Sequence, residues 1–416
     1  MGLPRTITAL TCVAALSATA ACTAAEGAEI HSARGTAARV PAADPRPYAR
    51  ADAAFGLDLL GAWCRRDPKA NIVLSPSSLA GGLGMVHLGA RGDTAKAIAR
   101  TLHLPSGDPL PGLHARTGAL RAVGGKDVAL RVTDQVWADK RVKTNGDYLD
   151  RVATAYDAGL KQLDIAGDPD AARRAVNDAV KKDTGGHIAD LLPVNSVSRG
   201  TGWILTDAVY LKARWAQEFT RSGTAPSRFT TAAGATVQAP AMRRDATYGY
   251  ARTGGWTAVD LPYTGGRLSM TALLPDASGT GCPSLSAGTL DRVTTALKPA
   301  MVGLTLPKAD LKSRTEAKPL LTALGMGIAF SDKADLTGMS PQALQLQFVR
   351  HAATLRVDEK GTEAAAATAA GVAVLGAAPP RDKIEVAFDR PYLLIVRDTR
   401  TGEPLFLARV ADPTRS

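Results

Sequence analysis

The residue types that carry nucleophilic, acid–base or metal chemistry occur in this chain, but not at the spacings that such sites use. Six histidines are scattered through the sequence, and none has the spacing of a metal-ligand pair. No Ser-x-x-Lys, Gly-x-Ser-x-Gly or His-Glu-x-x-His motif occurs, and no glycine-rich phosphate loop follows a strand-like run. The familiar hydrolases, metalloproteases and nucleotide-binding enzymes are therefore excluded by motif. We expect no catalytic residue, no metal and no cofactor.

The most informative stretch joins a strand-like run ending at Val357 to a segment with very small side chains. From Thr362 to Ala378 the only ionisable residue is Glu363, and no aromatic residue occurs. Composition alone favours a flexible linker here. A strand that inserts between two others would need the same small side chains, so both interpretations stay open at this point.

The remaining sequence predicts the elements that would position this segment. Helical spacing of apolar residues is found over 47–67, 79–88 and 168–182, and the second of these is apolar all round, as in a buried helix. Strand-like runs occupy 71–74, 128–133, 202–210, 268–274, 302–307, 346–357, 383–388 and 392–396. Helices dominate the first half and strands the second, without an alternating rhythm. This order predicts an α+β fold with mixed sheets.

The net charge of +11 does not indicate a nucleic-acid site, because lysines and arginines alternate with acids and form no dense basic run.

Residues 1–22 have the charge, the apolar run and the small residues of an export signal. Cys22 also fits a bacterial lipoprotein processing site, except that Thr19 stands where Leu is usual, so lipidation of Cys22 stays open. We expect 23–46 to be a flexible linker and the mature protein to be extracellular, either secreted or lipid-anchored at the cell surface. Whether Cys64 and Cys282 pair cannot be decided from their spacing.

Ten short motifs, in order from about residue 50 to the end, together resemble the serpins, a family of serine protease inhibitors. They are Asn71–Ser78, Leu88–Thr94, Asn177 with Val180 and Thr184–Ile188, Ala208–Trp215, Leu261–Tyr263 with Leu268–Met270, Leu306–Lys308, Leu324–Met326 with Ala329–Ser331, Glu359–Thr368, Val386–Tyr392 and Pro404–Phe406. At four positions the chain departs from the residue that is usual in the family. It has Asp207 instead of Asn, Leu211 instead of Phe, Ala179 instead of Trp and Tyr392 instead of Phe.

The resemblance implies a single serpin domain over residues 47–416. The expected fold has three mixed β-sheets, about eight to nine helices and an exposed reactive-centre loop at about 359–382. It also implies a monomeric suicide-substrate inhibitor. A serine protease, or alternatively a cysteine protease, attacks the loop and is trapped in a covalent complex when the cleaved loop inserts into the central sheet.

The hinge of that loop would comprise Glu359, Gly361, Thr362, Glu363, Ala364, Ala365, Ala366, Ala367 and Thr368. Alternate residues from Thr362 to Val372 are all small and uncharged, as an inserting strand requires on its buried face. This favours inhibition over the alternative, a non-inhibitory serpin acting as a carrier, chaperone or surface-binding protein. The specificity residue would be Leu375, with Gly376 after the cleaved bond, or alternatively Val374 or Ala377. An apolar residue there predicts chymotrypsin-, subtilisin- or elastase-like targets.

Two further groups match positions that control sheet opening in the family. Ser75, Ser78, Asp207 and His351 match a hydrogen-bonding cluster beneath the central sheet, where the carboxylate of Asp207 would keep His351 protonated. A merely structural core cluster is the alternative. Lys308 and Glu359 match an ion pair at the end of the sheet where insertion begins, with Trp215 covering it.

Overall fold

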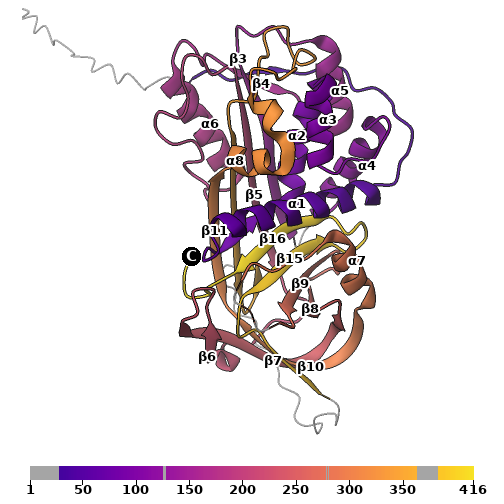
Figure 1. The fold of residues 1–416 in the computed structure, drawn as a ribbon, viewed down its shortest axis with the longest axis vertical. Helices are drawn as coiled ribbons and strands as arrows, with labels where there is room; N and C mark the ends of the chain where they lie inside the picture. The colour runs from indigo at the N-terminus through magenta and orange to yellow at the C-terminus, as the bar shows by residue number, and fades with distance from the viewer. Residues whose placement is uncertain (1–27, 125–127, 278, 280, 363–382) are drawn as a thin grey trace, which may run out of the picture.

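The structure is a computed structural model that describes residues 28–124, 128–277, 279, 281–362 and 383–416. Within these residues eight α-helices precede or interrupt the strands. They are α1 (Arg46–Arg66), α2 (Pro76–Gly89), α3 (Gly92–Thr101), α4 (Leu110–Arg121), α5 (Gly146–Tyr156), α6 (Pro169–Asp183), α7 (Ala287–Ala296) and α8 (Lys318–Leu321). Helix α1 crosses the middle of the molecule, with most helices above it and a strand-rich region below it (Figure 1).

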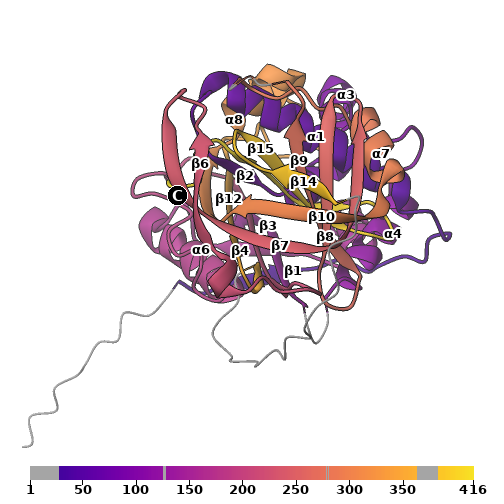
Figure 2. The same ribbon diagram turned by 90° about the horizontal axis from the view of Figure 1, so that it is seen from below.

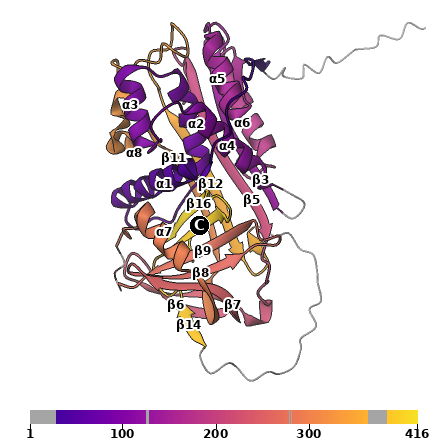
Figure 3. The same cartoon turned by 90° about the vertical axis from the view of Figure 1, so that its right-hand side faces the viewer.

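The first sheet has seven strands of mixed direction and holds the predicted hinge. In spatial order they are β1 (His31–Ala33), β4 (Leu160–Leu163), β3 (Val128–Asp139), β5 (Trp203–Arg214), β13 (Gly361–Thr362), β12 (Val349–Asp358) and β11 (Ala309–Glu316). Helix α6 lies on one face of its long strands and α2 on the other (Figure 3). The strands β5 and β12 run parallel, so no short turn can join them, and both are buried on their two faces.

The second sheet has nine strands. They are β14 (Ile384–Ala387), β10 (Lys298–Pro307), β7 (Thr236–Thr253), β8 (Trp256–Pro262), β9 (Leu268–Pro275), β15 (Tyr392–Asp398), β16 (Pro404–Val410) and β2 (Ile72–Leu74), with β6 (Ala225–Thr230) on the outer side of β7. Seen from below, β7, β10 and β14 lie side by side (Figure 2).

The number of sheets differs from the three that we expected. Strand β7 spans 18 residues, and it pairs with β6 over its first part, with β10 over its middle part and with β8 at its end. One long strand therefore joins what would be two sheets into a single hydrogen-bonded path. The mixed α+β fold itself is confirmed.

Helix α2 shows why the chain folds locally as its sequence predicts. Ser75 caps its first turn, accepting a hydrogen bond from the Ser78 backbone N–H, and Pro76 occupies the first helical position, where its missing N–H costs nothing. All its residues except His87 are buried. The helix lies behind β3 and β5 in the core, which fixes Ser75 and Ser78 beneath the first sheet.

The expected flexible linker over 23–46 does not hold for residues 31–38. Strand β1 pairs with β4 at the edge of the first sheet, and the backbone N–H groups of Thr36 and Ala38 donate to Asp150 and Thr154 on α5 at 2.7 and 2.9 Å. Because these contacts are made by the backbone to residues more than a hundred positions away, composition could not indicate them. Among the described residues, no helix combines the length and apolar character needed to span a membrane.

Candidate functional site

The hinge begins as a short strand held between β5 and β12. In β13, Thr362 is opposite Ala213 of β5 on one side and Val357 of β12 on the other, and Gly361 is opposite Arg214 and Asp358. Gly361 has φ +149°, and a Cβ there would lie 2.1 Å from the Ala213 carbonyl oxygen. Glycine is therefore required where the chain turns into the gap. The predicted hinge residues Glu363–Thr368 and the predicted reactive bond, Leu375–Gly376 with alternatives Val374 and Ala377, lie outside the described residues, as does Cys22.

The side chain of Thr362 is fully buried and contacts Tyr263, the residue that follows β8. Its hydroxyl lies 2.6 Å from the Tyr263 hydroxyl, and the Tyr263 ring stacks on Trp215 with 4.5 Å between ring centroids. Burial raises the pKa of Tyr263, which keeps its hydroxyl neutral. Trp215 donates from Nε1 to the Asp358 carbonyl at 2.9 Å, which places its ring beside the start of the hinge. Tyr263 belongs to one of the motifs that resemble the serpins, but the sequence does not predict its contact with Thr362.

Lys308 and Glu359 form an ion pair beside this entry point. The Lys308 Nζ atom lies 2.9 and 3.1 Å from the two carboxylate oxygens of Glu359, and Thr224 donates to the same carboxylate at 2.8 Å. Burial alone would raise the pKa of Glu359, but the hydrogen bonds from Lys308 and Thr224 outweigh it and lower the pKa. The carboxylate therefore stays charged and holds the end of β12 to the start of β11.

Further down, β5 and β12 pair directly, and their contact contains a buried histidine and carboxylate. His351 is opposite Asp207 in the parallel ladder, and His351 Nδ1 bonds to Asp207 Oδ1, with both side chains fully buried. The Ser75 backbone N–H donates to His351 Nε2 at 3.4 Å. The His351 ring therefore links β12 to β5 through one nitrogen and to the start of α2 through the other. The effect of the Asp207 carboxylate on the protonation of His351 stays a prediction.

Sequence analysis missed a third ionisable member of this cluster, Asp134 on β3. Asp134 is opposite Asp207 in the antiparallel β3–β5 ladder and accepts a hydrogen bond from the Ser78 hydroxyl. Burial, together with the neighbouring Asp207 carboxylate, raises the pKa of Asp134 well above its usual range. Asp207 Oδ2 is buried without a partner among the described residues. A proton kept on Asp134 supplies the donor that this oxygen lacks.

A second buried ionic group ties α1, α2 and α4 together next to this cluster. Arg116 of α4 bonds through Nε to Asp52 of α1 and through Nη2 to the Ser77 carbonyl, and it lies 3.3 Å from Glu403. Burial, followed by the Asp52 carboxylate, raises the pKa of Glu403 well above its usual range. The Arg116 charge is therefore balanced mainly by Asp52, and the group fixes the helices behind the first sheet.

The residue types Ser75, His351 and Asp207 resemble those of a hydrolase triad, but their geometry does not support catalysis. All three are fully buried, and His351 contacts the backbone N–H of Ser75 rather than its hydroxyl. A substrate carbonyl has no route to this serine. Among the described residues, no group of three His, Cys, Asp or Glu side chains could hold a metal ion.

Comparison with known proteins gives the family. The family model described as "Serpin (serine protease inhibitor)" matches residues 50–413. The chain belongs to the serpin family. Leukocyte elastase inhibitor of Sus scrofa is 32% identical over 378 residues, covering 87% of this serpin and 98% of the relative. An uncharacterized serpin-like protein of Thermococcus kodakarensis is 33% identical over 354 residues, covering 82% of this serpin and 81% of the relative.

Solved structures confirm the serpin fold. Maspin matches with a TM-score of 0.80 at 25% identity, covering 89% of this serpin and 99% of maspin. The thermophilic serpin tengpin in its native state matches with a TM-score of 0.80 at 23% identity, covering 91% and 97% of the two chains. The described strands therefore have the arrangement of a serpin, including the two strands between which β13 lies.

Proposed function

We propose that this serpin inhibits serine proteases as a suicide substrate. In this proposal a protease cleaves the segment between β13 and β14, and the part attached to β13 then extends as a new strand between β5 and β12. Proteins named leukocyte elastase inhibitor are among its relatives at 31–32% identity, which supports an inhibitory role. The family is described as one of serine protease inhibitors, and some of its members are non-inhibitory.

The observation that carries the proposal is the position of β13. Its two residues already form ladders with both β5 and β12, while further along the sheet β5 and β12 pair directly with each other, over Leu205–Val209 and Val349–Ala353. Continuing the two registers of β13 by counting places residue 368 opposite Asp207 and His351 at once. Insertion would therefore part the bond between these two side chains and place Thr368 between them.

The sequence of the inserting segment suits this path. Residues 364, 366, 368 and 370 would face the same side as the buried Thr362 and are Ala, Ala, Thr and Ala. None of them brings a charge or a large side chain into the core. Each inserted residue replaces one ladder between β5 and β12 by two ladders with the new strand, and this gain in pairing and burial would drive the trapping.

The proposed bait is Leu375, with Gly376 on the other side of the cleaved bond. An apolar residue at this position fits chymotrypsin-, subtilisin- or elastase-like proteases and not trypsin-like ones. A protein with an export signal would meet such proteases outside the cell. The disulfide between Cys64 and Cys282 supports an oxidising compartment, because disulfides persist mainly in exported proteins.

Incubation of the protein with chymotrypsin, subtilisin and elastase tests the proposal, with trypsin as the comparison. We expect an adduct of serpin and protease that survives SDS, and mass spectrometry should place the cut between residues 374 and 377. Rapid cleavage without any adduct would instead support a non-inhibitory serpin. A cut elsewhere in the loop would refute the assignment of Leu375.

A further inference from the structure

Positive charge is distributed unevenly along this chain. Residues 212–253 contain seven lysines and arginines and two acids, so this short stretch carries a net charge of +5 out of +11 for the whole chain. It comprises the end of β5, the short helix η1 (Arg221–Gly223), β6 and β7. The bases are spread out in the sequence, and the fold decides whether they meet.

The fold places these bases next to both ends of the proposed reactive loop. At the end of β5, Arg214 is opposite Gly361 of β13, where the loop begins. On β7, Arg243 is opposite Thr305 of β10, which is in turn opposite Ala387 of β14, the strand that follows the loop. Strands β6, β7 and β10 lie together at the lower end of the molecule (Figure 1). The stretch 212–253 therefore contributes charge on both sides of the loop.

The helix η1 lies beside the hinge and against β7. A Cβ atom at Gly223 would lie 2.9 Å from the Arg243 carbonyl oxygen, so the two segments are in direct contact. The Phe219 backbone N–H, just before η1, donates to the Glu359 carbonyl at 2.8 Å. The exposed side chains of Arg221 and Arg243 therefore belong to neighbouring segments next to the entry point of the loop.

The acids at this end of the molecule are already paired with other bases. Glu218 accepts a hydrogen bond from Arg214 at 2.8 Å, and Asp245 and Glu385 each lie 2.8 Å from the Lys383 Nζ atom. Five exposed bases here have no acid as an ion-pair partner among the described residues: Lys212, Arg221, Arg228, Arg243 and Lys298. They leave an excess of positive charge in contact with solvent.

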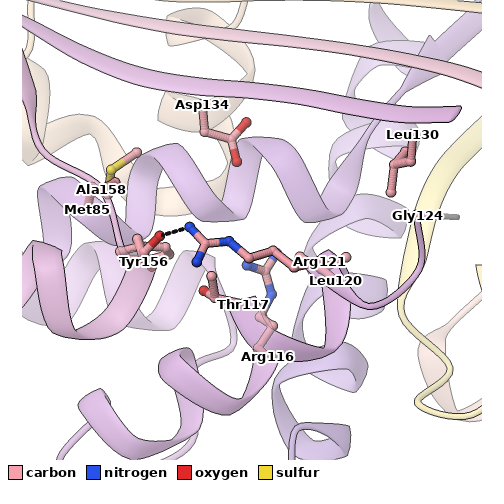
Figure 4. A pocket seen from close by; sticks show the side chains of 10 residues that line it. All are labelled: Met85, Arg116, Thr117, Leu120, Arg121, Gly124, Leu130, Asp134, Tyr156 and Ala158. Atoms are coloured by element: carbon pink, nitrogen blue, oxygen red, sulfur yellow. Dashed lines mark hydrogen bonds between the residues drawn. The ribbon is translucent and has the colours of Figure 1, made fainter. Parts of the chain in front are cut away.

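The guanidinium groups behind β3 have a different environment. Arg116 is buried and bonds to Asp52, and Arg121 pairs with Asp157. Figure 4 shows the side chain of Arg121 directed towards Tyr156, whose carbonyl accepts a hydrogen bond from it at 3.0 Å. Their charge is neutralised locally, so these groups do not add to the excess around the loop.

A protease that cuts the loop must lie over the five bases. The loop is joined to β13 on one side and to β14 on the other, and the bond to be cut has to enter the active site. The protease surface around that active site therefore faces the ends of β5, β7 and β10. Opposite charges on two such surfaces raise the rate of association, and like charges lower it. Bases on both sides of the loop suit a globular partner centred on it.

We propose that Lys212, Arg221, Arg228, Arg243 and Lys298 form a docking surface for proteases whose active site is surrounded by acidic residues. This inference rests on the proposed function, because it names the class of protease that the loop meets. The bait residue selects a primary pocket, whereas the five bases select by charge among proteases that share this pocket.

Chymotrypsin and its succinylated form test the docking surface, because succinylation replaces lysine ammonium groups by carboxylates. The second-order rate of loop cleavage is divided by the rate on a small peptide substrate. This ratio should be about tenfold higher for the succinylated form at low salt. Above about 300 mM NaCl, where the screening length is about 6 Å, the two forms should differ less than about twofold. Equal ratios at low salt, or a higher ratio for unmodified chymotrypsin, overturn the proposal.

Charge reversal at two exposed positions tests the residues themselves. Arg221→Glu with Arg243→Glu should lower the ratio for succinylated chymotrypsin about tenfold at low salt, without changing thermal stability. The control is Lys143→Glu with Lys333→Glu, which changes the net charge equally. Lys143 is exposed and follows β3 at the opposite end of β5, and Lys333 is exposed and follows η3 (Gly327–Phe330), which packs against α3 and α8. Equal effects of the two double variants would show that only net charge matters and refute the surface.

Two further outcomes separate this inference from its alternatives. Loop cleavage is measured whether or not the protease is then trapped, so a missing adduct refutes the proposed inhibition and leaves the charge comparison valid. Dextran sulfate serves as a polyanion without an active site. If it binds the protein through Arg221 and Arg243 while both forms of chymotrypsin cleave the loop at equal ratios, the surface binds a polyanion, and the proposal is wrong.

Discussion

The substitution Asp134→Asn should stabilise the protein at neutral pH. The buried acids Asp134 and Asp207 lie opposite each other, and of the two only Asp207 is hydrogen-bonded to His351. Asparagine keeps the shape of the neutral acid. Its amide can donate to Asp207 Oδ2, while its oxygen still accepts from the Ser78 hydroxyl.

The sign of the pH dependence follows from the raised pKa of Asp134. Between the pKa of an aspartate in the unfolded chain, about 3.9, and the higher pKa in the native state, the native state binds more protons. The free energy of unfolding therefore falls as pH rises through this window, by about 1.4 kcal/mol for each pH unit that lies inside it. The contribution is fully present below the unfolded pKa. Asparagine does not titrate, so in the variant this position does not lower the free energy of unfolding as the pH rises.

The magnitude is that of one poorly matched buried polar group, about 1–3 kcal/mol at pH 8 and close to zero at pH 4. Urea unfolding of both proteins at pH 4, 6 and 8, followed by circular dichroism, measures it. Asp52 and Glu403 also have raised pKa values and contribute a slope of the same sign in both proteins, so the difference between the two curves reports Asp134.

Asp310→Asn on β11 is the control, because Asp310 is exposed and lies in the same sheet. It should change the free energy of unfolding by less than about 0.5 kcal/mol at every pH. An Asp134→Asn protein that is less stable than the parent at pH 8, or that keeps the full slope, would refute the reasoning.

Three further substitutions address the hinge, its ion pair and the disulfide. Thr362→Arg places a charge in a fully buried position, so cleavage should continue while the yield of SDS-stable adduct falls at least tenfold on gels. Glu359→Lys sets two ammonium groups against each other and should open the sheet early, seen as polymers on native gels at elevated temperature, whereas Glu359→Lys with Lys308→Glu should remain monomeric. Cys64→Ser with Cys282→Ser should lower the free energy of unfolding by about 2–5 kcal/mol in urea titrations, because the disulfide closes a loop of more than two hundred residues.

The controls for these variants separate local from general effects. Thr236→Arg adds the same charge at an exposed position of β7 and should retain the adduct yield. If Thr362→Arg also retains it, the buried face of the inserting strand is wrongly assigned. Polymerisation of the charge-swapped double variant would show that the ion pair does not hold the sheet. An unchanged stability of the double serine variant in the absence of reductant would contradict a structural role for the disulfide.

The sequence predicted those features that depend on neighbouring residues. The cap of α2 at Ser75, the buried helix after it and the strands over 202–210 and 346–357 all follow from local patterns of polar, apolar and small residues. The contact between Asp207 and His351 was indicated only by the resemblance to the serpins. Nothing in the spacing of the two residues predicts it.

Features that depend on strand register could not be predicted. Asp134 stands in a strand with mixed polar and apolar residues, and only its pairing with β5 places it opposite Asp207. The Cys64–Cys282 disulfide, the Arg116 cluster and the pairing of β1 with β4 likewise join segments that are distant in the chain. In each case the tertiary arrangement decides which polar groups meet.

The stability of the loop-cleaved protein tests insertion most directly. A protease that cuts between residues 374 and 377 produces a chain whose new end is attached to β13. If that end inserts between β5 and β12, the midpoint of thermal unfolding, followed by circular dichroism, should rise by at least about 20 °C, because a complete central strand replaces one ladder by two and buries its own side chains. An unfolding temperature equal to that of the intact protein would contradict insertion as the source of inhibition.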